Sequence, residues 1–302
     1  MTLTIYCPIC DSNSLYLLSK DAYSFYRCSK CALVFVHPLP SEEFLGQEVY
    51  SPKSGYQGNK AKDLSQSSLT AKQAPILEAL VTLKPGGRLL DVGCSNGQFM
   101  FWAQKRGLKV TGVELNEATA SIAKTNGLDV FQGTLTQANF PDQSFDLIFL
   151  GDLIEHVSDP RAIIKDCQRL LVPSGFLAIV TPNLDCFWAR STFILFKLFK
   201  IPWSVLTPPH HLCQFSTTNL RQLLINQDFQ IKQTWYHHPS LKYELGMTHL
   251  WGAYKHDKKI RTLVYTLGSY ALYTLFFVFN YLSYPFRRSD FGLVMIVKKI
   301  LV

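Results

Sequence analysis

Residues 88–99 limit what this chain can fold into more than any other stretch. They read Arg-Leu-Leu-Asp-Val-Gly-Cys-Ser-Asn-Gly-Gln-Phe, which predicts an apolar strand, a turn with two glycines and a helix as far as Arg106. α/β proteins use this arrangement to present backbone N–H groups and a helix N-terminus to a ligand. Gly93 lets the chain turn sharply, and Gly97 would let the ligand lie against bare backbone.

The residue types in this turn indicate a positively charged nucleoside as the ligand. A dinucleotide fingerprint has three glycines in the register G-x-G-x-x-G, because the pyrophosphate rests directly on the turn. Here Asp91 precedes the first glycine, where a carboxylate repels a pyrophosphate and attracts an ammonium or sulfonium group. A second predicted strand, 109–114, ends in Glu114, which can accept both hydroxyls of a ribose. S-adenosylmethionine is the common ligand with both features.

The segment resembles the first motif of the class I S-adenosylmethionine-dependent methyltransferases, acid-x-Gly-x-Gly-x-Gly, with Ser95 where the middle glycine is commonest. The resemblance implies a doubly wound, mostly parallel, seven-stranded Rossmann-like sheet. In such enzymes an Asp or Asn after the third strand contacts the adenine, and here Thr134 and Leu135 occupy that bend. The implied cofactor-binding residues are Asp91, Gly93, Cys94, Ser95, Gly97, Glu114, Leu115, Thr134, Leu135 and Gly151.

The rest of the chain supports an α/β fold without the resemblance. Strands and helices alternate, and five predicted strands that alternate with helices indicate a parallel sheet. After the strand before Gly93, we expect strands at 109–114, 130–132, 145–150 and 176–180. A sixth strand is expected at 229–236 and a last one at 291–297. Methyltransferase folds of this kind close the sheet with an antiparallel last strand.

Four cysteines near the N-terminus have the spacing of a metal site. Cys7-x2-Cys10 and Cys28-x2-Cys31 form two knuckles, and together they complete the tetrahedral sulfur shell that suits a structural Zn²⁺ ion. The disulfide alternative requires an oxidising compartment, but the first residues lack a signal-peptide pattern and predict a cytoplasmic chain. We therefore expect a zinc ribbon at 1–40. The order of ribbon, Val-Phe-x-x-Pro-x-Pro-Ser and glycine turn resembles bacterial methyltransferases with an N-terminal zinc ribbon, often linked to surface-polysaccharide or sugar modification.

The remaining chain is divided into segments that differ in composition. We expect a linker or arm at 41–68, the cofactor-binding core at 69–185, an apolar basic lid insertion at 186–209, and the C-terminal part of the core at 210–302. Within the lid, residues 187–203 have the composition of a basic interfacial helix or of a core helix whose lysines reach solvent.

An uncharged apolar segment, residues 263–282, is long enough to span a bilayer and has basic residues on both sides. If the last strand pairs with the sixth, however, both ends of the segment must lie on the same side of the membrane, so a single crossing is excluded. We therefore expect residues 258–288 to form a monotopic or re-entrant helix at the inner membrane face. A buried helix over the substrate pocket is the alternative.

Candidate catalytic residues follow the strand at 145–150. Gly151 and Asp152 come directly after it, and the next Glu-His-Val resembles small-molecule methyltransferases, including quinone-ring O-methyltransferases. His156 is the first candidate base because the ordinary histidine pKa lies near neutral, followed by Asp152 and His211. His211 belongs to a His-Leu-x-x-Phe-Ser segment that lies near the acceptor pocket in the enzymes this chain resembles.

These features predict methyl transfer from S-adenosylmethionine to a small-molecule, sugar or lipid-linked acceptor at the membrane face. A hydrophobic content of 47% with 17% charged residues suits contact with a membrane or an apolar substrate, and the net charge of +8 suits phosphate-rich partners. An RNA methyltransferase whose ribbon grips its substrate is an alternative, but the chain lacks an Asn-Pro-Pro-Tyr signature after the fourth core strand. The other alternative is a non-catalytic zinc-ribbon binding protein with a degenerate cofactor fold.

Overall fold

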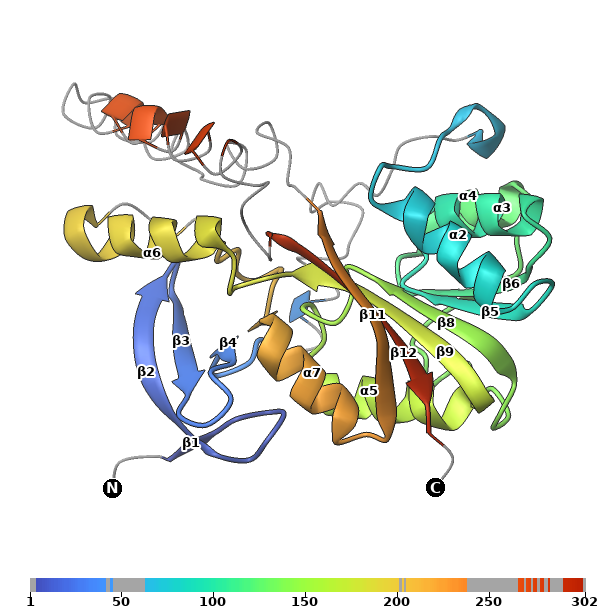
Figure 1. The fold of residues 1–302 in the computed structure, drawn as a ribbon, viewed down its shortest axis with the longest axis horizontal. Helices are drawn as coiled ribbons and strands as arrows, with labels where there is room; N and C mark the ends of the chain where they lie inside the picture. The colour runs from blue at the N-terminus through green and yellow to red at the C-terminus, as the bar shows by residue number, and fades with distance from the viewer. Residues whose placement is uncertain are drawn as a thin grey trace.

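The computed structural model describes residues 4–41, 44–45, 63–200, 203, 205–237 and 290–300, together with 266–268, 270–272, 274–275, 278–279 and 282. Within these residues, an α/β core lies beside a smaller antiparallel ribbon (Figure 1). The predicted arm lies mostly outside the described residues, as does most of the segment 258–288.

The central sheet has seven strands in the order β11-β12-β9-β8-β5-β6-β7. β12 runs antiparallel to both β9 and β11, and the other pairs are parallel. The predicted fold class is therefore confirmed, including the antiparallel last strand. The chain direction across the sheet reverses at β5, which makes the carboxyl end of β5 a topological switch point. The strands are β5 (Arg88–Val92), β6 (Lys109–Glu114), β7 (Val130–Gln132), β8 (Phe145–Gly151), β9 (Leu171–Pro182), β11 (Phe229–His237) and β12 (Gly292–Lys299).

Helices cover both faces of this sheet because its central strands are apolar on both faces. Adjacent strand residues such as Leu89 and Leu90 point to opposite faces, and both are fully buried. Leu90 belongs to the cluster formed with α5 (Pro160–Leu170) and α7 (Thr217–Ile225). Leu89 belongs to the cluster formed with α2 (Gln73–Leu83) and α3 (Gln98–Lys105), and α4 (Glu117–Thr125) packs beside α3.

Local capping residues set where several helices begin. The Asn116 side chain accepts a hydrogen bond from the Thr119 N–H at the start of α4. The Asp159 side chain caps α5, and Pro160 follows it at the first helical position, which proline favours. These boundaries follow from neighbouring residues and needed no tertiary information.

Strand β9 begins earlier than the sequence predicts. It starts at Leu171, directly after α5, whereas the sequence predicts a strand only at 176–180. Leu171 pairs with Phe145, and the pairing then resumes at Phe176 with Leu147. The Pro-Ser-Gly segment therefore forms an irregularity within the strand.

The N-terminal ribbon is an antiparallel sheet that recruits a strand from far along the chain. Its first strands are β1 (Ile5–Tyr6), β2 (Asn13–Lys20), β3 (Tyr23–Cys28) and β4 (Val34–Val36). β10 (Cys213–Gln214) pairs with β4 and adds a fifth strand. The ribbon therefore extends beyond the predicted 1–40, since its edge is completed by the segment that carries His211.

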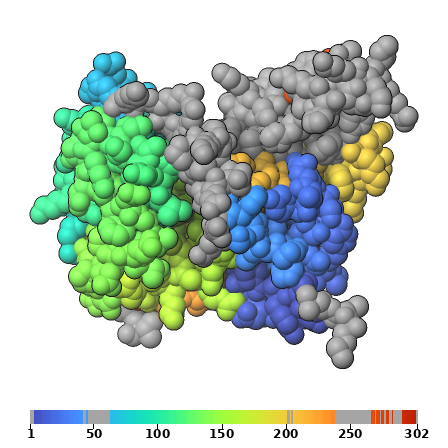
Figure 2. All heavy atoms as spheres, turned by 180° about the vertical axis from the view of Figure 1, so that it is seen from behind, coloured from blue at the N-terminus to red at the C-terminus, as the bar shows by residue number. Residues whose placement is uncertain are grey.

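Ribbon and core lie side by side in both whole-molecule views (Figures 1 and 2). The Arg161 guanidinium of α5 contacts the Asp11 carboxylate of the ribbon at 2.7 Å and 2.8 Å. Lys20 Nζ donates to the carbonyl oxygens of Trp203 and Leu206. One apolar cluster also runs from the ribbon into the face of the sheet covered by α5 and α7. The ribbon is therefore packed as part of the fold.

Helix α6 (Phe187–Phe199) lies across the ends of the ribbon strands (Figure 1). Trp188 packs with the ribbon residues Phe25 and Val36 on its buried face, whereas Leu198 and Phe199 are exposed. The helix therefore has one buried face and one exposed apolar face. Within the part of the chain that the structure describes, no helix combines the length and apolar character needed to cross a bilayer.

Candidate cofactor and acceptor site

The turn between β5 and α3 is built from left-handed backbone. Gly93 has φ +74° and Gly97 has φ +80°, values that only glycine adopts without strain. Ser95 also lies in this region, with φ +53°. The resemblance places a glycine most often at this position, and the backbone gives a physical reason for that preference.

Gly97 is required for a different reason from the one the sequence suggests. A Cβ atom at this position would lie 2.4 Å from Cδ1 of Leu128 and 3.0 Å from the Cβ of Ala123. The absence of a side chain at Gly97 therefore lets the start of α3 pack against Ala123 of α4 and against Leu128, shortly after α4. The expectation that Gly97 makes room for the ligand is replaced by a packing requirement inside the core.

Two carboxyl groups, Asp91 and Glu114, interact beside this turn. Glu114 accepts hydrogen bonds from the Ser95 N–H and the Asn116 N–H, both at 2.7 Å. Burial raises the pKa of Glu114, and the N–H groups of Asn116 and Ser95 work against that rise. Burial and then the nearby Glu114 charge raise the pKa of Asp91 to about 8. Because two buried carboxyls repel each other, this site favours a cation.

A cavity of about 250 Å³ opens at the carboxyl ends of β5, β8 and β9. It brings together the predicted residues Asp91, Gly93, Cys94, Ser95, Gly151 and Asp152. The other predicted cofactor residues do not line it: Leu115 and Thr134 are exposed, Leu135 is buried in the core, Gly97 packs against Ala123 and Leu128, and the Glu114 carboxylate bonds the backbone of the turn. The complete lining is Lys72, Gln73, Asp91, Gly93, Cys94, Ser95, Asn96, Gln98, Phe99, Phe149, Gly151, Asp152 and Val180.

Several cavity residues gave no signal in the sequence. Lys72, immediately before α2, forms an ion pair with Asp152 across the cavity. Phe99 and Phe149 stack with ring centroids 4.1 Å apart and form the apolar part of the lining. Lys72 lies in a polar stretch with no motif, so only its distance in space from Asp152 assigns it to the site.

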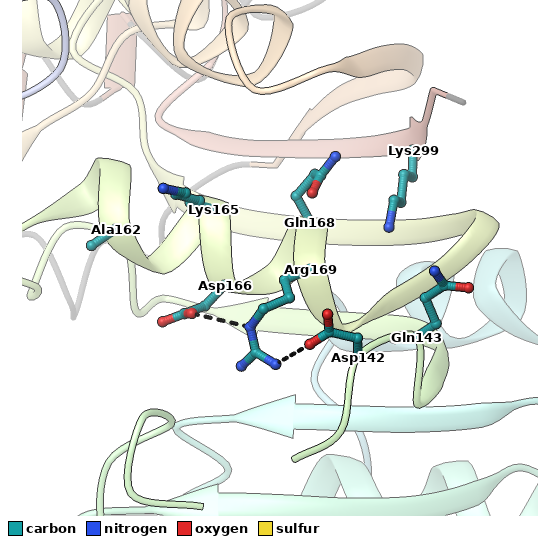
Figure 3. Close-up of a pocket in the computed structure, with 8 residues that line it drawn as sticks. All are labelled: Asp142, Gln143, Ala162, Lys165, Asp166, Gln168, Arg169 and Lys299. Carbon is teal, nitrogen blue, oxygen red and sulfur yellow. Dashed lines mark hydrogen bonds and ion pairs between the residues drawn. The ribbon is translucent and has the colours of Figure 1, made fainter. Parts of the chain in front are cut away.

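A second, larger hollow lies at the opposite end of the sheet (Figure 3). Its volume is about 520 Å³, and Arg169 bridges Asp142 and Asp166 across it at 2.7 Å and 3.7 Å. Asp142 and Gln143 precede β8, so this hollow is at the amino ends of the strands. Ligands of open α/β sheets bind beyond the carboxyl ends, so the smaller cavity is the candidate site.

The candidate bases His156 and His211 do not line the cavity; they pack against each other near Asp152, which does line it. Their rings are nearly perpendicular, with centroids 4.7 Å apart. His156 Nδ1 lies 2.6 Å from the carbonyl oxygen of His210, and since a carbonyl only accepts, Nδ1 carries the proton. Burial lowers the pKa of His156, and burial lowers that of His211 well below the usual value.

The side chain of Glu155 lies close to both histidines, with one of its oxygens within 4.8 Å of a ring nitrogen of each. Its side chain is only 1% exposed, and its Oε1 lies 4.0 Å from Nε2 of His156. Burial, followed by the charge of Asp152, raises the pKa of Glu155 to about 8. Its backbone carbonyl accepts hydrogen bonds from the N–H groups of Leu212 and Cys213, at 2.8 Å and 3.0 Å. The segment that completes the ribbon is thereby tied to the end of β8.

The four ribbon cysteines converge as their spacing predicts. Sγ of Cys7 lies 3.6 Å from that of Cys31, and Sγ of Cys10 lies 3.5 Å from that of Cys28. All four sulfurs lie within 4.8 Å of one another, and none is in a disulfide. Sulfurs bound to one zinc ion at about 2.3 Å are separated by about 3.8 Å. The four thiols therefore fit a tetrahedral zinc ion.

Comparison with protein families adds independent information. Residues 66–234, more than half of the chain, match the family described as methyltransferase domain. The chain belongs to this methyltransferase family. It has the class I fold, and the predicted assignment to that class is confirmed.

Curated relatives match a shorter stretch. A ubiquinone biosynthesis O-methyltransferase from Marinobacter nauticus is 36% identical over 107 residues, which cover 32% of this chain and 45% of the relative. One from Coxiella burnetii is 37% identical over 113 residues, covering 35% and 48%. The match thus spans less than half the length of these relatives.

Solved structures resemble the fold. YcgJ from Bacillus subtilis has a TM-score of 0.51 and 14% identity, over 76% of this chain and 98% of that chain. The [4+2]-cyclase SpnF has a TM-score of 0.50 and 20% identity, over 76% and 80%. At these identities the likeness concerns the fold alone.

Proposed function

We propose that this protein transfers the methyl group of S-adenosylmethionine to an oxygen of a small acceptor. The observation that carries the proposal is the pair of interacting carboxyls, Asp91 and Glu114, beside a glycine turn at the switch point of the sheet. Membership of the methyltransferase family and the O-methyltransferase names of the curated relatives support it.

In this proposal each cofactor-binding residue has a separate task. Asp91 faces the cationic methionine part, and Glu114 exchanges its bonds to backbone N–H groups for bonds to the ribose hydroxyls. Leu135 and backbone groups near Thr134 contact the adenine. Bound S-adenosylmethionine supplies a methyl carbon on a positively charged sulfur, which needs no protein nucleophile. The chain's main contribution is then to align the acceptor with that carbon, an effect worth roughly 7 to 11 kcal/mol in favourable cases.

His156 is our first candidate for the base that accepts the acceptor's proton. Its Nδ1 donates to the His210 carbonyl, so Nε2 carries the free lone pair. Burial keeps the ring neutral by lowering its pKa, which leaves Nε2 able to accept a proton. Asp152 lines the cavity but is paired with Lys72, and His211 lies against the His156 ring, so both rank behind His156.

We further propose that the acceptor is lipid-linked and that α6 contacts the membrane surface. The side chains of Ile194, Leu198 and Phe199 are 55%, 68% and 58% exposed on one helix. The Phe187 ring lies 5.4 Å from that of Phe279, in the apolar C-terminal segment where Leu275 is also exposed. Lys197 and Lys200 lie over rings of the same helix, which places positive charge beside its apolar face.

Vesicle flotation tests the membrane contact. The full chain should float with vesicles that contain anionic lipid, and a Leu198→Ser/Phe199→Ser double variant should float less. Leu39→Ser is the matched control, because Leu39 is an exposed apolar residue outside α6. Equal flotation of the double variant and the control would contradict the proposal.

The ribbon is proposed to hold a structural zinc ion through Cys7, Cys10, Cys28 and Cys31. With four sulfurs as ligands, no coordination position is left for a substrate. The ion's role is then to hold the ribbon, and with it the β10 segment that it completes.

Calorimetric titration with S-adenosylhomocysteine tests the cofactor site. We expect micromolar binding that Glu114→Ala abolishes, while Glu117→Ala on the adjacent helix leaves it unchanged. A silent titration of the wild-type protein would favour the non-catalytic binding protein. RNA that copurifies at moderate salt would favour the RNA methyltransferase. Mass spectrometry of lipid and polysaccharide fractions after supplying isotopically labelled methionine would identify the acceptor.

A further inference from the structure

Three side chains that can bind a metal ion converge beside the cofactor cavity. Glu155 and His156 follow β8, whereas His211 comes from the segment before β10. One ligand atom from each lies within 4.8 Å of those of the other two. No sequence motif joins them, because His211 is separated from the other two by more than fifty residues.

The buried polar atoms of this group lack ordinary partners. By distance and angle neither carboxylate oxygen of Glu155 makes a hydrogen bond, although the nearby Thr181 hydroxyl works against the rise in its pKa, and Nδ1 of His211 makes none. Both side chains are more than nine-tenths buried, at 1% and 8% exposure. Burial without a compensating charge disfavours the ionised form of such a carboxyl, and a bound cation would favour that form. The Glu155 oxygens and Nδ1 of His211 are therefore available to donate electron pairs to a ligand placed between them.

The orientation of His156 is that of a metal ligand. Its Nδ1–H donates to the backbone carbonyl of His210 at 2.6 Å, which fixes the ring and leaves the Nε2 lone pair directed elsewhere. Histidines that bind metal ions are commonly held by such a bond from the other ring nitrogen. Nε2 lies 4.0 Å from Oε1 of Glu155. That separation is too long for a hydrogen bond, but a shared ion can bridge it after a small side-chain movement.

We propose that Glu155, His156 and His211 bind a divalent transition-metal ion at the edge of the cofactor cavity. Two imidazoles and one carboxylate suit zinc, manganese or iron(II), and they leave coordination positions for other ligands. None of the three side chains lines the cavity itself, but Asp152 does, and its charge acts on both Glu155 and His156, so the group lies next to that part of the lining.

Resting on the proposed methyl transfer, the ion would have a chemical role. It would bind an acceptor hydroxyl and lower its pKa, so that the oxygen loses its proton to solvent. The oxygen then forms a bond to the methyl carbon, and the carbon–sulfur bond breaks to leave a neutral thioether. The substrate class is therefore an alcohol or phenol. His156 would act as a ligand in this case, and the ion would replace it as the group that activates the oxygen.

Manganese binding to the full-length protein tests the site. Mn²⁺ prefers oxygen and nitrogen ligands, so a ribbon already loaded with zinc does not compete for it. Electron paramagnetic resonance measures the free Mn²⁺ that remains at each protein concentration. We expect one bound ion per wild-type chain, and Glu155→Gln and His211→Gln should each weaken binding by at least about tenfold.

His37→Gln is the matched control, because His37 lies in the ribbon against the Tyr26 ring. It should bind Mn²⁺ as the wild type does. The thermal unfolding midpoint gives a second readout, since Mn²⁺ should raise it for the wild type and the control but not for Glu155→Gln. A wild-type protein that binds no Mn²⁺, or a Glu155→Gln variant that binds it equally well, would overturn the proposal.

These measurements need neither cofactor nor acceptor. A missing metal site would therefore leave the proposed methyl transfer standing, with His156 as its base. Conversely, a silent titration with S-adenosylhomocysteine would remove the proposed function without affecting the Mn²⁺ result.

Discussion

Replacing Asp91 with asparagine should change how cofactor affinity depends on pH. Asp91 is only 3% exposed, and burial together with Glu114 raises its pKa to about 8. At pH 7 about nine-tenths of the ligand-free protein therefore carries a neutral Asp91. The cationic cofactor favours the ionised carboxylate, so binding below about pH 8 should release a proton.

The size of the effect follows from that pKa. Wild-type affinity should rise about tenfold per pH unit below pH 8 and level off above it. Asp91→Asn has no carboxyl to ionise and lacks this rise. The ratio of wild-type to variant affinity should therefore increase about fiftyfold between about pH 6 and pH 8.

The free energy of unfolding of the ligand-free protein should change with pH in the opposite direction, falling as the pH rises. The pKa of Asp91 is higher in the folded protein than the ordinary 3.8, so the native state binds more protons between about pH 4 and pH 8. Stability is greatest at the acidic end of this window and falls as the pH rises through it. The fall due to Asp91 is at most about 6 kcal/mol, and Asp91→Asn should remove it from urea unfolding curves.

Calorimetry at several pH values, in two buffers with different ionisation enthalpies, measures both the affinity and the proton release. Comparing the two proteins at each pH cancels the titration of the cofactor's own amino group. A ratio of affinities that stays constant between pH 6 and pH 8 would refute the reasoning. Absence of proton release in the wild type would refute it as well.

Three further predictions concern the turn and the ribbon. Ser95→Gly should raise the free energy of unfolding by up to about 1 kcal/mol, because φ +53° strains serine; an unchanged urea midpoint would contradict this. Gly97→Ala should lower the free energy of unfolding by at least about 2 kcal/mol, because the added methyl group would clash with Leu128. A variant as stable as the wild type would show that Leu128 moves aside at little energetic cost. A chelator that removes the proposed zinc ion should speed hydrogen exchange at residues 212–214, which pair with β4, while β5 amides stay protected; equal protection with and without the chelator would show that the ion does not stabilise this segment.

Local sequence determined much of this protein. The strand, turn and helix at 88–99, the caps at Asn116 and Asp159 and the spacing of the four cysteines are each set by residues close together in the chain. Backbone dihedrals, capping and hydrophobic period act over a few residues, so a pattern along the chain is enough to predict them. The alternation of strands and helices then restricted the fold to a parallel sheet.

Only the tertiary structure decided which distant residues share the site. Lys72 pairs with Asp152, β10 completes the ribbon, and His211 comes to lie against His156. Even the need for glycine at position 97 depends on Leu128, thirty-one residues later. Such contacts arise when separate elements pack against one another, and nothing in the local pattern of either partner encodes the other's position.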